Sequence, residues 1–563
     1  MSVLLSATYT AASALPPVAQ TSLGPVVGLR TGATNSFLGI PYAEPPVGEL
    51  RWKDPIDYST PYALPGWDAT AYGAVCPQQS GGSSSAVTGE EDCLFLNVHV
   101  PAGVSAAAVE EKTSTTLLPV MVFLHGGGLL SGSGSAYNGS SLAASNGTVV
   151  VTLNYRLGAL GMLALDEAQS DAQPTGNYAY LDQRAALHWV SREIASFGGD
   201  PDRVTLFGES AGATSVCVHL ASEASYGLFS AALTESAYVC DAYWSKADAL
   251  AITDTYAAAA GCSVDASANA NNNAKSNSNS NSNSNNASTS ANVTCLRALA
   301  VSDVLDFSGS VGKFPHPTLD LVNWAEPPMR TLSEGRGAAS TDVDMPFAGG
   351  YNTDEASFFV PPDLFLDAAA YEAQLASLLS NASLLDEALA LYPPDANASA
   401  NNRDAYVLAF THQAIECCTL RLARAMSSSS NSNSNSNSSS SFSLSWLYWF
   451  DAYDECDFDP AVYGVPHTAE LRYVFDSWDA GGCDPPDADA TSLSRHMQAK
   501  LWSGFAVARA MPNEWPPAFQ SSDSDPLEIH LVKGDAPYDV VAGRDADYCA
   551  FWEKDSPFGQ QER

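Results

Sequence analysis

The sequence predicts an α/β fold in which a large, mostly parallel, twisted sheet is flanked by helices. First, several segments are near-continuous apolar runs, as expected for strands that helices cover on both faces. Second, a segment between two of these runs repeats Leu187, Val190 and Ile194 at helical spacing and ends at Gly198. This alternation of strand and helix is typical of a doubly wound sheet.

Six segments are expected to form strands of this sheet, because each is rich in apolar and β-branched residues. They are residues 117–125, 147–156, 203–207, 345–351, 443–453 and 527–534. The expected helix covers residues 180–198, between the second and third of these strands.

Two Asn/Ser-rich segments, residues 269–292 and 427–443, interrupt this pattern. They lack the apolar groups needed to offset the entropy of ordering, so we expect flexible surface insertions. Because strand-like and helix-like segments continue on both sides, residues 21–563 are predicted to form one domain. Residues 1–20 have an apolar beginning and a cleavage-like Ala-Ser-Ala but no basic residue, which suggests a degenerate leader segment.

The chain is strongly acidic. It has 25 Lys and Arg against 63 Asp and Glu, a net charge of −38 over 563 residues. This charge argues against nucleic acids or an anionic membrane surface as partners. No run of 18 apolar residues is present, so we expect no transmembrane helix.

Eleven cysteines are present, none with the paired CxxC spacing of a zinc site. Disulfides or scattered buried thiols are the two explanations that remain. Seven Asn-x-Ser/Thr sequons favour the secretory pathway, where disulfides also form. Those asparagines are Asn138, Asn146, Asn286, Asn292, Asn381, Asn397 and Asn437.

One short stretch, "LFGESAGA" at 206–213, places Ser210 between an apolar run and a helix-like segment. Gly208 and Gly212 remove the Cβ atoms that would clash in a tight turn, which is the geometry of a nucleophile elbow. A helix N-cap serine after a turn explains the same residues, and the pattern alone leaves both open. The glycine run at 126–128 could turn its amides toward a carbonyl oxygen, or could be a simple flexible turn.

With these motifs together, the chain resembles the type-B carboxylesterase and cholinesterase family of α/β-hydrolases. The matching motifs occur in order at residues 37–46, 91–101, 125–129, 154–163, 176–190, 207–213, 349–359, 463–475 and 549–552. The resemblance therefore extends along nearly the whole chain and leaves out only the two insertions and the termini.

The resemblance implies a serine-centred site. Ser210 would be the nucleophile, Glu355 the carboxylate and His467 the general base, in the chain order that α/β-hydrolases use. Backbone amides of Gly127, Gly128 and Ala211 would form the oxyanion hole.

Each side chain has a structural alternative. His467 could be an ordinary core or surface histidine. Glu355 and Asp354 could be two solvated loop acids. Glu209, next to the serine, could bias the site toward cationic or polar substrates, or could only be ion-paired.

The resemblance also implies three disulfides and two structural salt bridges. The disulfides would join Cys76 to Cys93, Cys262 to Cys295, and Cys417 to Cys549, with Cys418 competing for the third. Five cysteines remain outside this scheme: Cys217, where we expect a buried thiol, Cys240, Cys418, and the possible pair Cys456 and Cys483. The salt bridges would join Arg51 to Glu91 and Arg156 to Asp182.

The implied activity is hydrolysis of carboxylic esters through an acyl-enzyme, with no metal or cofactor. The loop between the first two cysteines carries no aromatic residue and is short and polar. The tryptophan that binds choline in cholinesterases and the long apolar lid of the family's lipases are therefore not expected there, and soluble carboxylic esters are favoured as substrates. The alternatives are a lipase acting on lipid esters, and a non-catalytic adhesion or binding module like the neuroligins.

Overall fold

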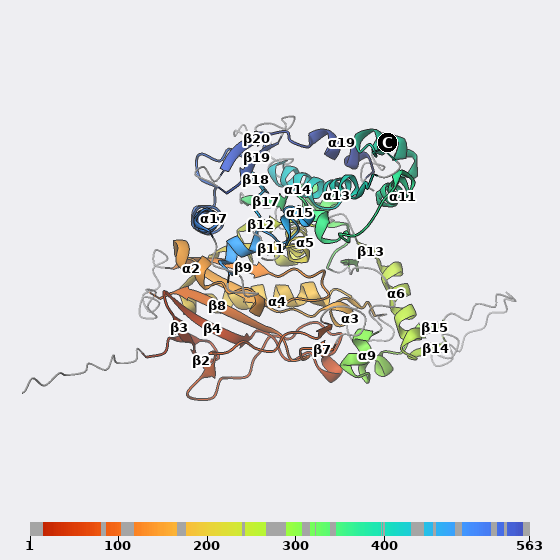
Figure 1. Ribbon diagram of the computed structural model, residues 1–563. Helices are drawn as coiled ribbons and strands as arrows, with labels where there is room; N and C mark the ends of the chain where they lie inside the picture. Colours follow the sequence, from red (N-terminus) through yellow and green to blue (C-terminus); the bar gives the residue numbers. More distant parts are fainter. Residues whose placement is uncertain are drawn as a thin grey trace, which may run out of the picture.

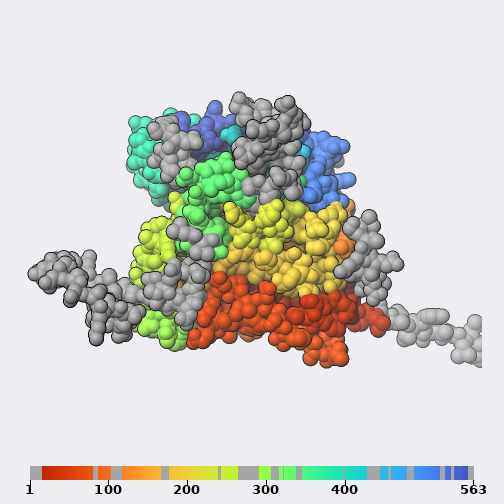
Figure 2. Space-filling view, turned by 180° about the vertical axis from the view of Figure 1, so that it is seen from behind, coloured from red at the N-terminus to blue at the C-terminus, as the bar shows by residue number. Residues whose placement is uncertain are grey.

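The computed structural model describes residues 15–79, 86–102, 117–165, 176–238, 243–265, 289–306, 316–320, 323–337, 345–395, 397, 400–428, 444–453, 458–478, 487–519, 526–533 and 538–555. Figure 1 shows the strands of one large twisted sheet rising from β3 to β20, with helices packed along both sides. Seen from behind, the N-terminal segments form one end of the molecule and the C-terminal segments the other (Figure 2).

The main sheet has eleven strands in the order β20-β19-β18-β17-β12-β11-β9-β10-β8-β4-β3. Neighbouring strands from β10 to β19 are parallel, whereas β8, β4 and β3 at one edge and β20 at the other are antiparallel. The strands are β3 (Leu29–Thr31), β4 (Thr34–Pro41), β8 (Phe95–Pro101), β9 (Leu118–Leu124), β10 (Val149–Leu153), β11 (Gly199–Glu209), β12 (Ala231–Glu235), β17 (Phe347–Asn352), β18 (Ser445–Phe450), β19 (Leu527–Leu531) and β20 (Tyr538–Ala542).

Smaller elements surround this sheet. The minor strands are β1 (Val18–Thr21), β2 (Gly24–Val27), β5 (Trp67–Asp68), β6 (Gln78–Gln79), β7 (Val87–Thr88), β13 (Trp244–Ser245), β14 (Ser263–Asp265), β15 (Thr289–Ala291) and β16 (Thr318–Leu319). The α-helices are α2 (Ser140–Asn146), α3 (Gly158–Met162), α4 (Tyr178–Glu193), α5 (Ala211–Leu220), α6 (Lys246–Ala259), α8 (Val293–Arg297), α9 (Val301–Asp306), α10 (Pro328–Ser333), α11 (Ala368–Leu378), α12 (Leu385–Leu391), α13 (Arg403–Thr411), α14 (Cys417–Ser428), α15 (Pro460–Tyr463), α16 (Leu471–Phe475), α17 (Ala488–His496), α18 (Ser503–Ala508) and α19 (Ala546–Asp555).

Helices cover both faces of the sheet because its central strands are apolar on both sides. In β9, Val120 and Val122 join a core cluster with residues of α4, α5, α10 and α14. Met121 and Phe123 point to the opposite face and pack with residues of α2, α16, α17 and α18. Successive side chains of a strand alternate between faces, so an unbroken apolar run is what two helical layers require.

The prediction of a large, mostly parallel sheet flanked by helices is confirmed, and all six expected strands belong to it. The expected helix begins at Tyr178 and ends at Glu193, after which a single 3₁₀ turn, Ile194–Phe197, leads to Gly198. Gly198 has φ +85°, a left-handed conformation that glycine adopts without steric cost. Among the described residues, no helix is both long and apolar enough to cross a bilayer.

The structure contains the three disulfides named above, Cys76–Cys93, Cys262–Cys295 and Cys417–Cys549. Cys217 and Cys418 are buried and belong to none of these three. Both expected salt bridges are also present: Arg51 Nε lies 2.7 Å from Glu91 Oε1, and Arg156 Nη2 lies 2.7 Å from the fully buried Asp182 Oδ1.

Several predictions fall on residues outside the description, namely Cys240, Cys456, Cys483, Asn286, Asn437, most of both insertions and residues 1–14 of the leader. Regular structure reaches into the ends of these predicted segments. Strand β1 begins at Val18, β15 occupies residues 289–291, and α14 extends to Ser428.

Candidate active site

Ser210 lies on the turn that joins β11 to α5 at the carboxyl edge of the sheet. Its backbone has φ 57° and ψ −121°, a conformation that costs energy for a residue with a side chain. The turn is held on both sides, because the Ser210 amide donates to Glu235 O at 2.9 Å and the Ser210 carbonyl accepts from the Thr214 amide at 2.9 Å. The strained serine is therefore a fixed feature of the fold.

The glycines on either side of Ser210 are required by packing. A Cβ on Gly212 would lie 1.9 Å from Leu124 O, and one on Gly208 would lie 2.7 Å from the same oxygen. Real Cβ atoms do not approach a backbone oxygen so closely. The sequence-based interpretation of these residues as an elbow thus has a direct steric cause in the neighbouring strand β9.

His467 and Glu355 form a buried pair. His467 Nδ1 lies 2.6 Å from Glu355 Oε2. The other carboxylate oxygen, Oε1, accepts from Ser236 Oγ at 2.5 Å and from the Asn352 amide at 2.7 Å. These contacts hold Glu355 in place, and Glu355 in turn orients the imidazole so that Nδ1 carries the proton and Nε2 is available.

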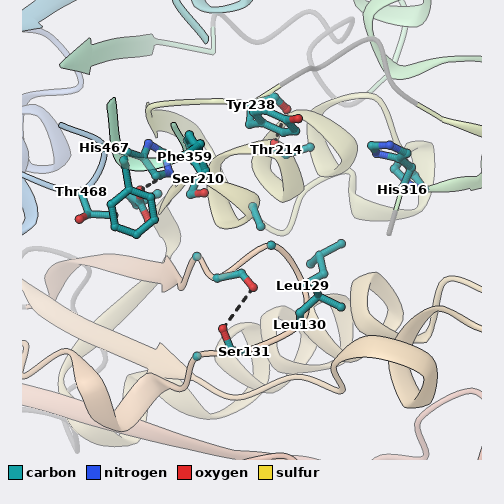
Figure 3. Close-up of a pocket in the computed structure, with 18 of the residues that line it drawn as sticks. Leu129, Leu130, Ser131, Ser210, Thr214, Tyr238, His316, Phe359, His467 and Thr468 are labelled. Atoms are coloured by element: carbon teal, nitrogen blue, oxygen red, sulfur yellow. Dashed lines mark hydrogen bonds and ion pairs between the residues drawn. The ribbon is translucent and has the colours of Figure 1, made fainter. Parts of the chain in front are cut away.

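Ser210 and His467 line the same cavity, which has a volume of about 780 Å³. Figure 3 shows the two side chains next to each other on one wall, with Leu129, Leu130 and Ser131 across the open space. Within the described part of the chain, His467 Nε2 has no hydrogen-bond partner. A buried ring nitrogen that makes no regular hydrogen bond and lies beside a serine is suited to accept that serine's proton.

The glycine loop after β9 approaches the elbow closely. A Cβ on Gly126 would lie 2.3 Å from Glu209 Oε2 and 3.0 Å from Ser210 Cβ, so only glycine fits there. Gly127 and Gly128 have φ +98° and +64° and, like Ala211, line the cavity. The three residues expected to provide an oxyanion hole therefore lie around the same space as the serine.

Glu209 is almost completely buried at the cavity wall, and its Oε1 lies 3.1 Å from His467 Nε2. Burial raises the pKa of Glu209 to about 8, although the nearby His467 acts in the opposite direction. For His467, burial lowers the pKa, but Glu209, Glu355 and Glu470 outweigh burial and raise it to about 9. Glu209 was expected either to bias the site toward cationic or polar substrates or only to be ion-paired. The structure favours the ion pair, with His467 as the partner.

Aromatic side chains form much of the remaining cavity wall. They are Tyr137, Tyr180, Tyr238, Phe358, Phe359 and Phe410. Phe359 also packs against the imidazole of His467, with ring centroids 5.1 Å apart. The apolar wall matches a ligand with an apolar group next to one polar, reactive bond.

Sequence reasoning missed two residues that support this site. Ser236, the hydrogen-bond donor to Glu355, follows β12, a short strand that was not predicted. Glu470 lies three residues after His467, inside the matching motif at 463–475, and it accepts from Asn352 Nδ2 at 2.6 Å. Spacing alone could have placed Glu470 on the turn after His467, but it could not show that the side chain points inward.

Comparisons with known proteins agree with this geometry. A profile described as the carboxylesterase family matches residues 15–552. Carboxylesterase 1C of Mus musculus is 34% identical over 370 residues, which cover 62% of this chain and 59% of that protein. Para-nitrobenzyl esterase of Bacillus subtilis is 45% identical over 232 residues, covering 39% of this chain and 43% of that protein. The matches thus span less than two thirds of these curated relatives.

A solved structure of PNB esterase matches over a greater length. It superposes with a TM-score of 0.73 at 29% sequence identity and covers 95% of this chain and 99% of that one. The similarity therefore includes both the sheet and the helical layers on either side of it.

Proposed function

From the premise that this chain belongs to the carboxylesterase family and has the α/β-hydrolase fold, we propose that it is a serine hydrolase of carboxylic esters. The resemblance inferred from the motifs is confirmed by the family match. One observation carries the proposed activity: the strained Ser210 shares a cavity with the buried His467–Glu355 pair.

In the proposed mechanism, Ser210 Oγ attacks the ester carbonyl while His467 Nε2 removes its proton. Amides of Gly127, Gly128 and Ala211 stabilise the oxyanion, and each donor contributes about 3 kcal/mol to the transition state. The imidazolium, held by Glu355, then donates the proton to the leaving alcohol. Water repeats the sequence on the acyl-enzyme, so the reaction needs no metal or cofactor.

A fluorophosphonate probe tests the proposal, because it reacts only with an activated serine. We expect the wild-type protein to be labelled at Ser210, and Ser210→Ala to lose both the label and hydrolysis of p-nitrophenyl acetate by roughly 10⁴-fold or more. Ser131→Ala is a matched control, because Ser131 lines the same cavity and has no proposed role in the chemistry. A folded wild-type protein that remains unlabelled would overturn the proposal.

We further propose small, soluble esters as the substrates, since aromatic residues form part of the cavity wall and the cysteine-bounded loop is polar. A para-nitrobenzyl ester is a sensible first substrate, given the name of the bacterial relative. Activity on p-nitrophenyl esters should fall as the acyl chain lengthens from acetate to palmitate. A maximum at long chains would favour the lipase alternative, and no labelling at all would favour the adhesion module.

The three disulfides are typical of proteins that fold in the oxidising secretory pathway or its lumen. Secretion and glycosylation at the exposed sequons are part of the proposal. Release into the medium, and a loss of mass on treatment with an N-glycosidase, would support both.

A further inference from the structure

A second cluster of buried, chemically active side chains lies outside the proposed catalytic site. His412 and Glu416 begin and end one π-helical turn between α13 and α14, and Asp545 immediately precedes α19. His412 Nε2 lies 3.7 Å from Glu416 Oε2 and 3.8 Å from Asp545 Oδ1. One nitrogen and two carboxylate oxygens thus converge, all within 4.8 Å of one another.

Among the described residues, this cluster leaves two buried polar atoms of His412 and Glu416 without a hydrogen-bond partner. Within the described residues, His412 Nε2 and Glu416 Oε1 have no hydrogen-bond partner, although both side chains are only 1% exposed. The other ring nitrogen, Nδ1, lies 2.8 Å from the hydroxyl of Tyr392. That hydroxyl also accepts from Trp552 Nε1 at 2.9 Å. In the tautomer that carries the proton on Nδ1, Nε2 presents its lone pair to the carboxyl groups of Glu416 and Asp545.

The charges around the cluster leave a deficit of positive charge. Arg544 faces the carboxylates of Glu416, Asp545 and Glu528, and its Nε lies 3.0 Å from Asp545 Oδ2. The guanidinium is held over the ring of Trp449 at 3.7 Å from the ring centroid. Three buried carboxyl groups thus share one guanidinium, and a divalent cation bound between them would compensate charge that the guanidinium alone does not.

The local fold holds these side chains together. In a π-helical turn, residues four apart project from the same side, as His412 and Glu416 do, and such turns are frequent at functional sites. The disulfide between Cys417 and Cys549 ties α14 to α19 directly beside Glu416 and Asp545. The two backbone segments that provide the converging atoms are therefore covalently linked.

We propose that His412, Glu416 and Asp545 bind one divalent transition-metal ion of the zinc type. A nitrogen with two carboxylate oxygens suits zinc, whereas calcium and magnesium prefer ligands made only of oxygen. Donor atoms around tetrahedral zinc lie about 3.4 Å apart, so the 3.7 and 3.8 Å separations need to close by only a few tenths of an ångström. The ion would hold α14 against α19 as a structural site.

Metal content and thermal stability test the proposal on the full-length chain. After incubation with ZnCl₂ and gel filtration, we expect about one zinc per chain by elemental mass spectrometry. The melting temperature should rise with ZnCl₂ and fall after treatment with EDTA. A protein that retains no zinc and melts at the same temperature in both solutions would show a carboxyl pair sharing a proton and would overturn the proposal.

Variants locate the ion. Glu416→Gln and His412→Gln should lose the bound zinc. Tyr392→Phe removes the partner of His412 Nδ1, together with the acceptor of Trp552 Nε1, and should weaken binding about 10- to 100-fold. His99→Gln is the control, because His99 is equally buried but its recorded partner is the hydroxyl of Ser36.

Hydrolysis of p-nitrophenyl acetate reports that each variant is folded. If a ligand variant does not fold, Co²⁺ added to the wild-type protein provides a second measurement. Visible absorption bands typical of low-coordinate Co²⁺ with a nitrogen ligand would support the site, and the absence of such bands would contradict it. Zinc that remains at one equivalent in folded Glu416→Gln and His412→Gln would place the ion elsewhere and overturn the assignment.

Discussion

The imidazole of His467 has a carboxylate beside each of its two nitrogens. Glu355 binds Nδ1, and Glu209 lies 3.1 Å from Nε2. Burial alone would lower the pKa of His467, but the surrounding glutamates raise it to about 9. A general base must be neutral, so activity should increase as pH rises and should be lost as pH falls below this value.

Glu209→Gln should move the acidic limb of the pH profile. The substitution removes one negative charge beside Nε2, so the protonated form of His467 loses a stabilising partner and its pKa falls. We expect the midpoint of the acidic limb of kcat/KM to move by about one pH unit to lower pH. The measurement is kcat/KM for p-nitrophenyl acetate between pH 5 and pH 10.

Glu223→Gln is the matched control for this experiment, because Glu223 is exposed in the turn after α5. It should leave the limb where it is in the wild-type protein. An unchanged or more alkaline limb in Glu209→Gln would contradict the electrostatic role of Glu209.

Single residues show what a sequence can and cannot predict at this site. Ser210 was predictable because its flanking glycines are a local steric requirement. The direction of the Glu209 side chain was not, since neighbours in sequence do not reveal which wall a side chain faces. Ser236 was missed for a related reason: its partner Glu355 is 119 positions away in the chain.

Helix α5, which follows β11, packs closely against the neighbouring strand β9. The first turn of α5 lies against the end of β9, and Gly212 is the contact point. Gly212→Ala should therefore push the helix away from the strand and move Ser210 with it. We expect a loss of labelling by fluorophosphonate of at least tenfold, together with a lower melting temperature.

Gly261→Ala is a control with the same change of side chain. Gly261 has a positive φ, +69°, unlike Gly212 in α5, but a Cβ there would meet no atom within 4 Å. It should cost only about 1 kcal/mol of stability and leave labelling intact. Equal effects of the two substitutions would mean that contact with β9 does not explain the glycine at 212.

Strands that are mainly apolar could be predicted from the sequence, whereas β4 and β12, which have buried polar residues at one end, could not. Central strands such as β9 and β10 are buried on both faces and are continuous apolar runs. Strand β4 is equally buried, but it includes Thr34, Asn35 and Ser36, whose polar groups are satisfied by neighbours that only the fold supplies. Strand β12 was missed because it is short and ends in two buried polar residues, Thr234 and Glu235.

At the scale of the whole molecule, charge dominates. The chain carries a net charge of −38, so mutual repulsion on the surface destabilises the compact state at neutral and alkaline pH. Buried groups act in the same direction. Burial raises the pKa of Glu235 well above its ordinary value, and a carboxyl of this kind stabilises the fold less and less as pH rises through its folded pKa.

The melting temperature should therefore fall between pH 7 and pH 9. His467 adds to this fall: its pKa is raised to about 9, so the stability it contributes below its unfolded pKa is lost as pH rises through 9. Buried histidines such as His125, whose pKa burial lowers to about 4, oppose the trend only below pH 6.5 and do not affect this window.

Salt separates the effect of the surface charges from that of the buried groups, because 0.5 M NaCl screens the surface charges and leaves buried groups largely unaffected. The melting temperature of Glu235→Gln should exceed that of the wild-type protein by more at pH 9 than at pH 7, because glutamine has no proton to lose. The substitution keeps the hydrogen bond, since Trp502 Nε1 can donate to the amide oxygen as it does to Glu235 Oε1 at 2.9 Å. The measurement is the melting temperature by differential scanning calorimetry at both pH values. A wild-type melting temperature that rises from pH 7 to pH 9 in high salt would contradict the claim that the buried Glu235 carboxyl lowers stability as pH rises.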